Sequence, residues 1–397
     1  MPAREDTMTA LRRDPGSGRE QHAAALELFY DLVFVFAVTQ VSHLLLTHLT
    51  WEGAGQSALV LLVVWWAWNY NTWVTNELNT DSTVVILLMV ALMLASLLMA
   101  VAIPGAFGGR ALLFAGSYVA IQVGRHSFLT FAAATPGTLE RVRAARILTW
   151  FVGAGVLWIA GALASGTART LLWLVALALD YGAPLVTYRV PGRERMTPEA
   201  WSVQTSHFAE RFQLFVIIAL GESIVLIGAT TSDLHLDAAR LTAFAFAFLG
   251  AAALWWLYFG SVARIAERSL AAAEHRTLVA RDAYTYLHVV IVAGVIVSAV
   301  GDELVIAHPT DTLSGAEVAA VVAGPVIYLV AHVLVRLRLE GVVAWKRLTG
   351  ALACAAVAVF GSFAPALVLA ALLVAVLAAV IAWERPRRGQ PLERAAS

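Results

Sequence analysis

Long apolar stretches, each close to 20 residues, recur along the whole chain and are separated by short charged loops. A helix needs about 20 mostly apolar residues to cross a bilayer, and it satisfies its own backbone hydrogen bonds there. Only 14% of the 397 residues are charged, against about 25% in soluble domains. The sequence therefore predicts an all-α fold, a polytopic transmembrane helical bundle, and it lacks the polar helix faces of a large soluble bundle.

About twelve spans can be distinguished by their hydropathy, and we expect a helix in each. The last two belong to one nearly continuous apolar stretch, which Gly361, Ser362 and Pro365 interrupt. The predicted spans are residues 28–48, 57–75, 84–103, 111–131, 147–164, 170–188, 207–229, 241–260, 282–300, 317–335, 345–361 and 365–383.

The arginines and lysines predict how the bundle is oriented. With the N-terminus in the cytoplasm, the cytoplasmic segments hold 22 of the 27 Lys and Arg residues, and the opposite loops hold only Arg110, Arg169 and Arg240. Basic residues stay on the cytoplasmic side of a membrane. We therefore expect both termini in the cytoplasm and an even number of spans. The basic residues determine how the protein is oriented in the membrane, and the net charge is zero. A nucleic acid is therefore not an expected partner.

The segments outside the spans complete the predicted organisation. Residues 1–20 are charged and lack an apolar core, which predicts a tail and not a cleaved signal peptide. The single cysteine, Cys354, excludes an intrachain disulfide framework and a CxxC redox site. The predicted parts are a disordered cytoplasmic tail at 1–20, a six-helix half at 21–190, a cytoplasmic linker at 191–206, a second six-helix half at 207–383 and a basic cytoplasmic tail at 384–397.

A shift of 183 residues aligns two short patterns, each at the cytoplasmic start of a span. Glu27-x-Phe29-x-x-x-Val33 matches Glu210-x-Phe212-x-x-x-Val216. This match suggests two parallel six-helix repeats, an arrangement that places a central cavity between halves in many carriers. Chance similarity between aromatic-rich apolar helices is the alternative.

The first span contains two carboxylates, Glu27 and Asp31, within otherwise apolar sequence. Residues four apart share one face of a helix, about 6 Å apart along its axis. A charge inside the hydrocarbon costs a few kcal/mol and usually faces the bundle interior or pairs with an opposite charge. Arg211, which opens the seventh span, is the expected partner of one of these acids.

Three motifs together resemble the bacterial low temperature requirement A family. They are Glu-Leu-Phe-Tyr-Asp-Leu-Val-Phe-Val-Phe-Ala-Val-Thr-Gln at 27–40, Trp-Asn-Tyr-Asn-Thr-Trp-Val-Thr-Asn at 68–76, and His-Phe-Ala-Glu-Arg-Phe-Gln-Leu-Phe-Val-Ile-Ile-Ala-Leu-Gly-Glu-Ser-Ile at 207–224. Gln213 is a small departure, because His or Gly is expected there. The resemblance covers about residues 20–385 and implies a multi-pass protein of the bacterial inner membrane, without implying a substrate.

Nearly all ionisable groups within the predicted spans lie toward the cytoplasmic side. One interpretation is structural, with Glu27, Asp31 and Glu210 neutralising Arg125 and Arg211. The other is a cytoplasm-facing cavity that binds a polar substrate or relays protons. The candidate substrate- or ion-binding residues are Glu27, Asp31, Asn69, Asn76, His207, Glu210, Arg211, Glu222 and Ser223.

Glu222 is the most informative of these candidates. It follows Glu210 by 12 residues, which places it about 18 Å deeper in the membrane, with no cation in its own span nearby. A carboxyl buried without a partner charge favours its protonated form, so Glu222 is a candidate proton or cation site, or a neutral packing residue. Asp180 in the sixth span is a weaker candidate of the same kind.

The remaining polar and aromatic patterns are less specific. The histidines lie apart from one another with no HxxxH or HExxH spacing, so no metal and no cofactor is expected. The tryptophans, including Trp65, Trp66 and Trp68, are typical of interfacial belts, and Trp68 or Trp73 is a weaker candidate for stacking on a substrate.

Three classes of function remain open. The first is a proton- or cation-coupled transporter or channel with a polar cavity open to the cytoplasmic side, whose partners are the lipid bilayer and a small solute or ion. The second is an integral membrane enzyme or lipid-modifying protein at the inner leaflet, for which no catalytic residue is identified. The third is a membrane component or sensor that acts through other proteins.

Overall fold

The computed structural model describes Leu11 and residues 24–197, 200–201, 203–232, 234–361 and 363–385. All regular structure in these residues is helical and none is a strand, which confirms the predicted all-α class. Apart from Leu11, the predicted tail at 1–20 lies outside the described residues. The predicted tail at 384–397 lies outside them as well, except for its first two residues.

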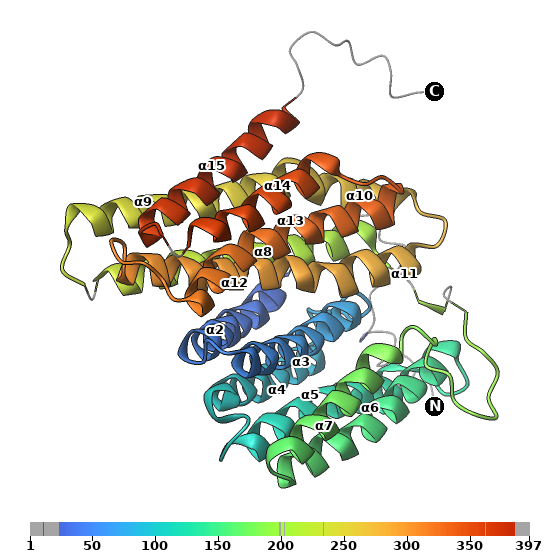
Figure 1. The fold of residues 1–397 in the computed structure, drawn as a ribbon. Helices are drawn as coiled ribbons and strands as arrows, with labels where there is room; N and C mark the ends of the chain where they lie inside the picture. The colour runs from blue at the N-terminus through green and yellow to red at the C-terminus, as the bar shows by residue number, and fades with distance from the viewer. Residues whose placement is uncertain are drawn as a thin grey trace, which may run out of the picture.

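The first six long helices form one layer of the molecule, drawn in blue to green in Figure 1. Within this layer most of α3 beyond its first two turns is buried, whereas α4 and α7 present apolar side chains outward. These helices are α2 (Ala25–Thr47), α3 (Trp51–Thr75), α4 (Thr83–Ala102), α5 (Ala111–Phe128), α6 (Leu139–Leu163) and α7 (Gly166–Gly182).

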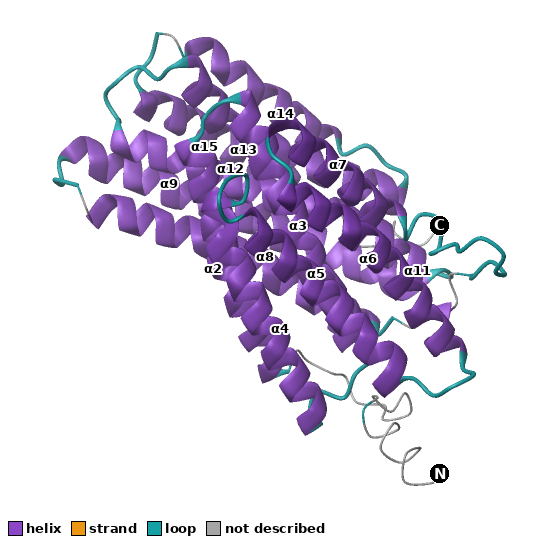
Figure 2. Cartoon of the chain, turned by 90° about the horizontal axis from the view of Figure 1, so that it is seen from below, coloured by secondary structure: helices purple, strands orange, loops and turns teal. Residues whose placement is uncertain are grey.

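The later helices form a second layer, in which α12 packs against α8, α9 and α13 and also reaches α2 in the first layer. The helices of both layers run roughly along a common direction, and the loops gather at the two ends of the bundle (Figure 2). The helices of the second layer are α8 (Thr205–Ser232), α9 (Ala238–Leu257), α10 (Ala263–Ala272), α11 (Arg276–Val279), α12 (His288–Ala307), α13 (Gly315–Glu340), α14 (Trp345–Val357) and α15 (Ala366–Glu384).

Three π-helical turns interrupt the α-helical geometry. They are η2 (Leu129–Ala133) after α5, η4 (Tyr258–Val262) after α9, and η5 (Ala280–Leu287), which joins α11 to α12. Single π-helical turns are frequent at functional sites. Two short 3₁₀ turns, η1 (Ile103–Gly105) and η6 (Ala358–Phe360), end α4 and α14.

Helices occupy every predicted span, but they differ in their capacity to cross a membrane. By length and composition, 8 helices of the described chain are long and apolar enough to do so, and the predicted count of twelve spans stays a prediction. α7 and α14 are short, with 17 and 13 residues. The eight are Ala25–Thr47, Thr83–Gly105, Leu139–Leu163, Thr205–Ser232, Ala238–Ala272, Arg276–Ala307, Gly315–Glu340 and Ala366–Glu384.

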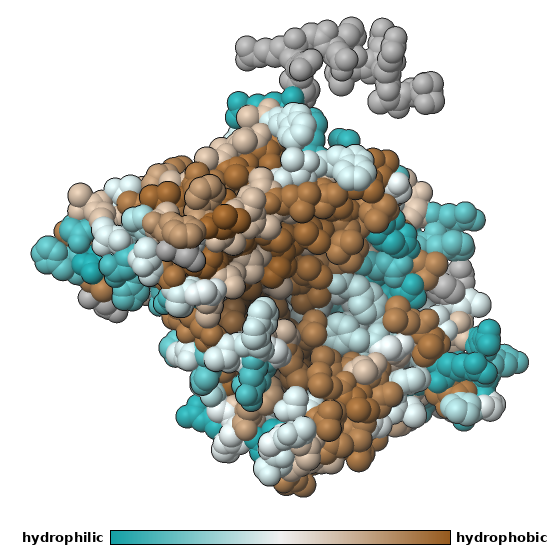
Figure 3. Space-filling view, in the orientation of Figure 1, coloured by the Kyte–Doolittle hydropathy of each residue, from teal (hydrophilic) through white to brown (hydrophobic). Residues whose placement is uncertain are grey.

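The outer surface of the bundle is largely apolar, as the brown areas of Figure 3 show. Large side chains such as Leu87, Val156 and Leu352 are more than 60% exposed. Soluble proteins rarely expose continuous apolar surface of this kind, so this surface faces lipid and the protein is a membrane-embedded, multi-pass helical protein.

The expectation that the tryptophans form interfacial belts is wrong for several of them. Trp65, Trp66 and Trp68 of α3 are buried in the protein interior, as are Trp158 and Trp173. The reason is that α3 lies among other helices, where the indole rings pack on aromatic neighbours. The N–H groups of Trp65 and Trp68 find acceptors there, in the Thr285 carbonyl and Asp31.

The contact between α12 and α13 depends on glycines that let the helices approach closely. A Cβ added to Gly324 would clash with the backbone nitrogen of Ser298, whereas one added to Gly116 of α5 meets nothing within 4 Å. We expect Gly324→Ala to lower the free energy of unfolding by about 1–3 kcal/mol, the usual cost of overpacking. Denaturant titration in detergent, with Gly116→Ala as the control, measures this loss. Equal stability of the two variants would contradict the close packing.

Candidate functional site

The helices α2 and α8 lie side by side and run in the same direction. Three side-chain contacts join them in order: Glu27 with His207, Asp31 with Arg211, and Thr39 with Glu222. The two residues of each contact are therefore 180 to 183 positions apart in the sequence. Five of the nine predicted site residues belong to this interface, which we call the α2–α8 interface.

The Asp31–Arg211 pair is the strongest ionic contact of the interface. Arg211 donates from Nη1 to Asp31 Oδ2 at 2.5 Å and from Nη2 to Asp31 Oδ1 at 2.7 Å. Both side chains are buried, and the bidentate geometry is the one that best repays the desolvation of two charges. The predicted pairing of Arg211 with an acid of the first span is confirmed.

Trp68 of α3 fixes the position of Asp31 from a third helix. Its indole Nε1 donates to Asp31 Oδ1 at 2.8 Å, and the Arg211 guanidinium lies 6.0 Å from the centre of the Trp68 ring. The ion pair is thus held by an indole donor and an aromatic face, and it ties α2, α3 and α8 together.

We expect Trp68→Phe to destabilise the protein by about 1.5–3 kcal/mol, because it removes a hydrogen bond to a charged acceptor. Trp173→Phe is the matched control, since Trp173 is equally buried and donates to a neutral carbonyl, that of Trp158, at 3.0 Å. Both variants lose stability because the ring becomes smaller. Beyond that shared cost, Trp173→Phe should lose only about 1 kcal/mol. Thermal unfolding of both purified variants decides between them, and a larger loss for Trp173→Phe would contradict the assigned role.

Glu27 and His207 form the contact nearest the start of both helices. His207 Nε2 lies 2.8 Å from Glu27 Oε2, and neither side chain is exposed. The same oxygen of Glu27 accepts a hydrogen bond from the backbone N–H of Ala24 at 2.9 Å, which caps α2. This carboxylate therefore has a structural task at the helix end besides any part in binding.

Glu222 lies near the middle of the α2–α8 interface, far from the ion pairs. It is 11 residues beyond Arg211, or about 16 Å along the helix. The Thr39 hydroxyl lies 2.5 Å from Glu222 Oε2 and 3.1 Å from the carbonyl oxygen of Val35. Among the described residues, Oε1 of Glu222 and the neighbouring Ser223 hydroxyl have no hydrogen-bond partner.

This arrangement accommodates Glu222 in either protonation state. When Glu222 is charged, the Thr39 hydroxyl donates to it. When Glu222 is protonated, its own O–H donates to the Thr39 oxygen, and the Thr39 proton turns to the Val35 carbonyl. A hydroxyl with two acceptors in reach thus keeps a hydrogen bond to the carboxyl through a change of charge.

A second carboxylate, Glu303 of α12, approaches Glu222 closely enough to repel it. Thr230 of α8 and His43 of α2 lie beside Glu303. Sequence reasoning missed Glu303 and its neighbour Asp302 because the ninth span was predicted to end at residue 300, whereas α12 continues to Ala307. The run Gly-Asp-Glu at 301–303, inside an apolar stretch, is the signal that could have revealed them.

Aromatic and aliphatic side chains separate the ion pairs from Glu222. Phe212 and Phe215 of α8 pack on the Trp65 ring, with ring centres 5.7 and 5.4 Å away. Phe34 and Val38 of α2 are fully buried at the same level. Between its two polar levels, the α2–α8 interface is therefore closed by apolar side chains.

One interpretation of the sequence predicts that an acid neutralises Arg125, and the structure shows a different environment. Its guanidinium is fully buried and donates to the Ala67 carbonyl at 3.1 Å and to the side-chain oxygen of Gln122. None of its described contacts is with a carboxylate, because Asp31 is already engaged by Arg211. Asp180 accepts instead from Tyr118 at 2.8 Å and from Trp158 at 2.9 Å.

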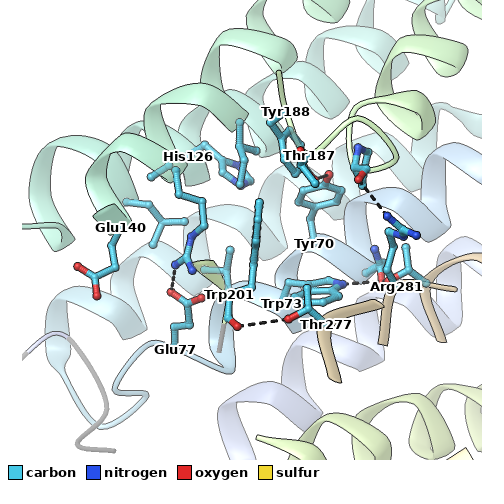
Figure 4. A pocket seen from close by; sticks show the side chains of 18 of the residues that line it. Tyr70, Trp73, Glu77, His126, Glu140, Thr187, Tyr188, Trp201, Thr277 and Arg281 are labelled. Atoms are coloured by element: carbon cyan, nitrogen blue, oxygen red, sulfur yellow. Dashed lines mark hydrogen bonds and ion pairs between the residues drawn. The ribbon is translucent and has the colours of Figure 1, made fainter. Parts of the chain in front are cut away.

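A cavity lies at the end of the bundle where α2 and α8 begin, and we call it the aromatic cavity. Its unfilled space, open mouth included, is about 930 Å³, of which about 80 Å³ has room for the centre of a water molecule. Of the predicted site residues only Asn69 lines it, and the walls are mostly apolar. Figure 4 shows Tyr70, Trp73, Tyr188 and Trp201 around it.

The remaining predicted site residues lie outside both features. Asn76 is buried at the C-terminal cap of α3, and Glu210 is half-buried on α8. In the part of the chain that the structure describes, no group of three or more His, Cys, Asp or Glu side chains is placed to hold a metal ion.

Comparison with known proteins places the chain among bacterial membrane proteins. Residues 22–382 match the sequence model of the family described as bacterial low temperature requirement A protein. An uncharacterized protein of Rhizobium meliloti (strain 1021) is 37% identical over 305 residues, which are 76% of this chain and 74% of that protein. No solved structure matches the chain.

Proposed function

The chain belongs to the bacterial low temperature requirement A family, and we propose that it is a proton- or cation-coupled transporter or channel of the inner membrane. Glu222 carries this proposal. It is a carboxyl at mid-helix, 1% exposed and without a cationic partner among the described residues, and it keeps a hydrogen bond to Thr39 in either charge state. Ionisable residues at such depth mark ion pathways and proton relays.

The path that we propose follows the α2–α8 interface. Glu27, His207, Asp31 and Arg211 lie at one end, Glu222 and Thr39 in the middle, and Glu303 and His43 beyond them. The apolar side chains between Arg211 and Glu222 close this path on the side where α2 begins. Movement of α2 against α8 would open that side, as alternating access requires.

The packing of the helices supports two parallel six-helix halves, divided as the sequence suggests into 21–190 and 207–383. In each half the first helix packs on the second and third, the third on the fourth, the fourth on the fifth, and the fifth on the sixth. The shift of 183 residues that aligns the motifs also carries Thr39 onto Glu222. Glu222 and Thr39 would then lie on the axis that relates the halves, with twelve spans and both termini in the cytoplasm.

Reconstitution into liposomes tests this function. Vesicles that contain the purified protein and an internal pH dye receive a pH gradient, and then sodium and potassium gradients with a set membrane potential. Flux above that of protein-free vesicles is the expected result. If no gradient drives flux and the deletion strain has an altered lipid profile that complementation restores, the inner-leaflet enzyme hypothesis replaces the transporter.

A further inference from the structure

The aromatic cavity is bordered by two of the three π-helical turns. Leu129 and Ala133 come from η2, and Arg281 and Thr285 come from η5. Its unfilled space includes an open mouth. It lies apart from Glu222, which does not line it, so nothing in the proposed ion path accounts for it.

A directed chain of hydrogen bonds ends at the cavity wall with a donor that has no partner. Trp73 Nε1 donates to Thr285 Oγ1 at 3.0 Å, and the Thr285 hydroxyl in turn donates to Asn69 Oδ1 at 3.0 Å. The Asn69 amide is thereby oriented with its NH₂ group free, and Nδ2 is buried without a partner among the described residues. A buried donor of this kind costs about 1–3 kcal/mol when unpaired, so it calls for an acceptor on a ligand.

The positive charge of Arg125, behind the wall of the aromatic cavity, favours an anion as the ligand. The Arg125 guanidinium, which has no described carboxylate partner, lies 5.6 Å from the centre of the Tyr70 ring, and Tyr70 lines the cavity. The other lining arginines, Arg143 and Arg281, are already paired with Glu77 and Asp282. Glu140, which also lines the cavity, has an interaction partner of its own. A buried unpaired cation is costly, and an anion in the cavity would relieve that cost.

The walls favour a flat, apolar body for this anion. The exposed lining is mostly apolar, and four aromatic rings surround the space: Tyr70, Trp73, Tyr188 and Trp201. We infer that the aromatic cavity binds a small organic anion with an aromatic body, whose acid group accepts from Asn69 near Arg125. That this anion is also carried across the membrane would rest on the proposed function, whereas its binding does not.

Three probes that share an indole ring system and differ in charge test the inference. Indole-3-acetate, indole-3-acetamide and tryptamine differ in being anionic, neutral and cationic. Equilibrium dialysis of each against the purified full-length protein should show the anion bound at least about tenfold more tightly than either other probe, a difference of about 1.4 kcal/mol. If none of the three binds, or if tryptamine binds most tightly, the inference is overturned by the wild-type protein alone.

Two isosteric variants then locate the site. Asn69→Asp replaces the free donor with an acceptor and should weaken indole-3-acetate binding at least about tenfold. Asn71→Asp is the matched control, because Asn71 is equally buried with an unpartnered amide but does not line the cavity. Unchanged binding by Asn69→Asp, or an equal loss in both variants, would place the anion elsewhere. Proton flux in liposomes, measured separately, shows whether the transporter proposal stands independently of this outcome.

Discussion

Replacement of Glu222 by Gln should abolish gradient-driven flux while the protein remains folded. Glutamine keeps the shape of the side chain and its hydrogen bond to Thr39, but it can neither bind a cation as a carboxylate nor exchange a proton. We expect flux to fall at least about tenfold, to the level of protein-free liposomes, a larger loss than the roughly 1 kcal/mol of a single neutral hydrogen bond explains. Internal pH in liposomes measures the flux.

Glu340→Gln is the matched control for this prediction. Glu340 is a half-buried carboxylate at the end of α13 whose ion pair is with Arg336, one helical turn away. This variant should keep wild-type flux. If Glu222→Gln also keeps it, the carboxyl is a packing residue, and the proposed path loses its central group.

Separation of the Asp31–Arg211 pair should be the most destabilising change in the interface. Asp31→Asn removes the carboxylate that pairs with the buried Arg211 guanidinium, and Arg211→Met leaves the buried Asp31 carboxylate without its ion-pair partner. Removal of one partner of a buried pair costs about 3–5 kcal/mol. The double variant leaves neither charge and should cost less than the two single losses combined, because each loss is mostly the penalty of the partner left behind.

Denaturant unfolding in detergent gives the four free energies of this double-mutant cycle. The surface pair Arg336–Glu340, with side chains about 30% exposed, supplies the comparison, and its coupling should be about 0.3–0.5 kcal/mol. Additive losses at Asp31 and Arg211 would mean that the buried contact does not hold α2 to α8.

Much of the fold could be predicted from hydropathy alone. Every predicted span coincides with a helix, and the starts of α4, α8 and α13 differ from their predictions by two residues or fewer. Long apolar runs report helices reliably because a membrane helix must satisfy its backbone internally. The same signal does not report which helices face lipid, and so the buried tryptophans of α3 were assigned to the membrane interface.

The candidate site was predicted in part. The four-residue spacing of Glu27 and Asp31 correctly indicated one helix face, and Arg211 was correctly named as a partner. Which acid pairs with which base depends on how α2 lies against α8, and single-helix periodicity does not contain that information. For this reason His207 with Glu27, Thr39 with Glu222, and the isolated Arg125 emerge only from tertiary packing.

Glu303 and the aromatic cavity could not be foreseen for the same reason. Glu303 lies 81 residues after Glu222 in the chain and reaches it only because α12 packs on α8. The cavity is built from six separate segments of the chain, two of which contain the turns η2 and η5. Two of its members were candidates from the sequence: Asn69, a polar residue in an apolar span, and Trp73, a weaker candidate for stacking on a substrate.

A current recorded on a supported membrane tests most directly whether charge moves through Glu222. Proteoliposomes of wild type, Glu222→Gln and Glu340→Gln are adsorbed and exposed to a rapid pH step, then to sodium and potassium steps. We predict a transient current in wild type and Glu340→Gln for at least one cation, and none in Glu222→Gln. No current in wild type for any of the three steps, or an undiminished current in Glu222→Gln, would contradict the account.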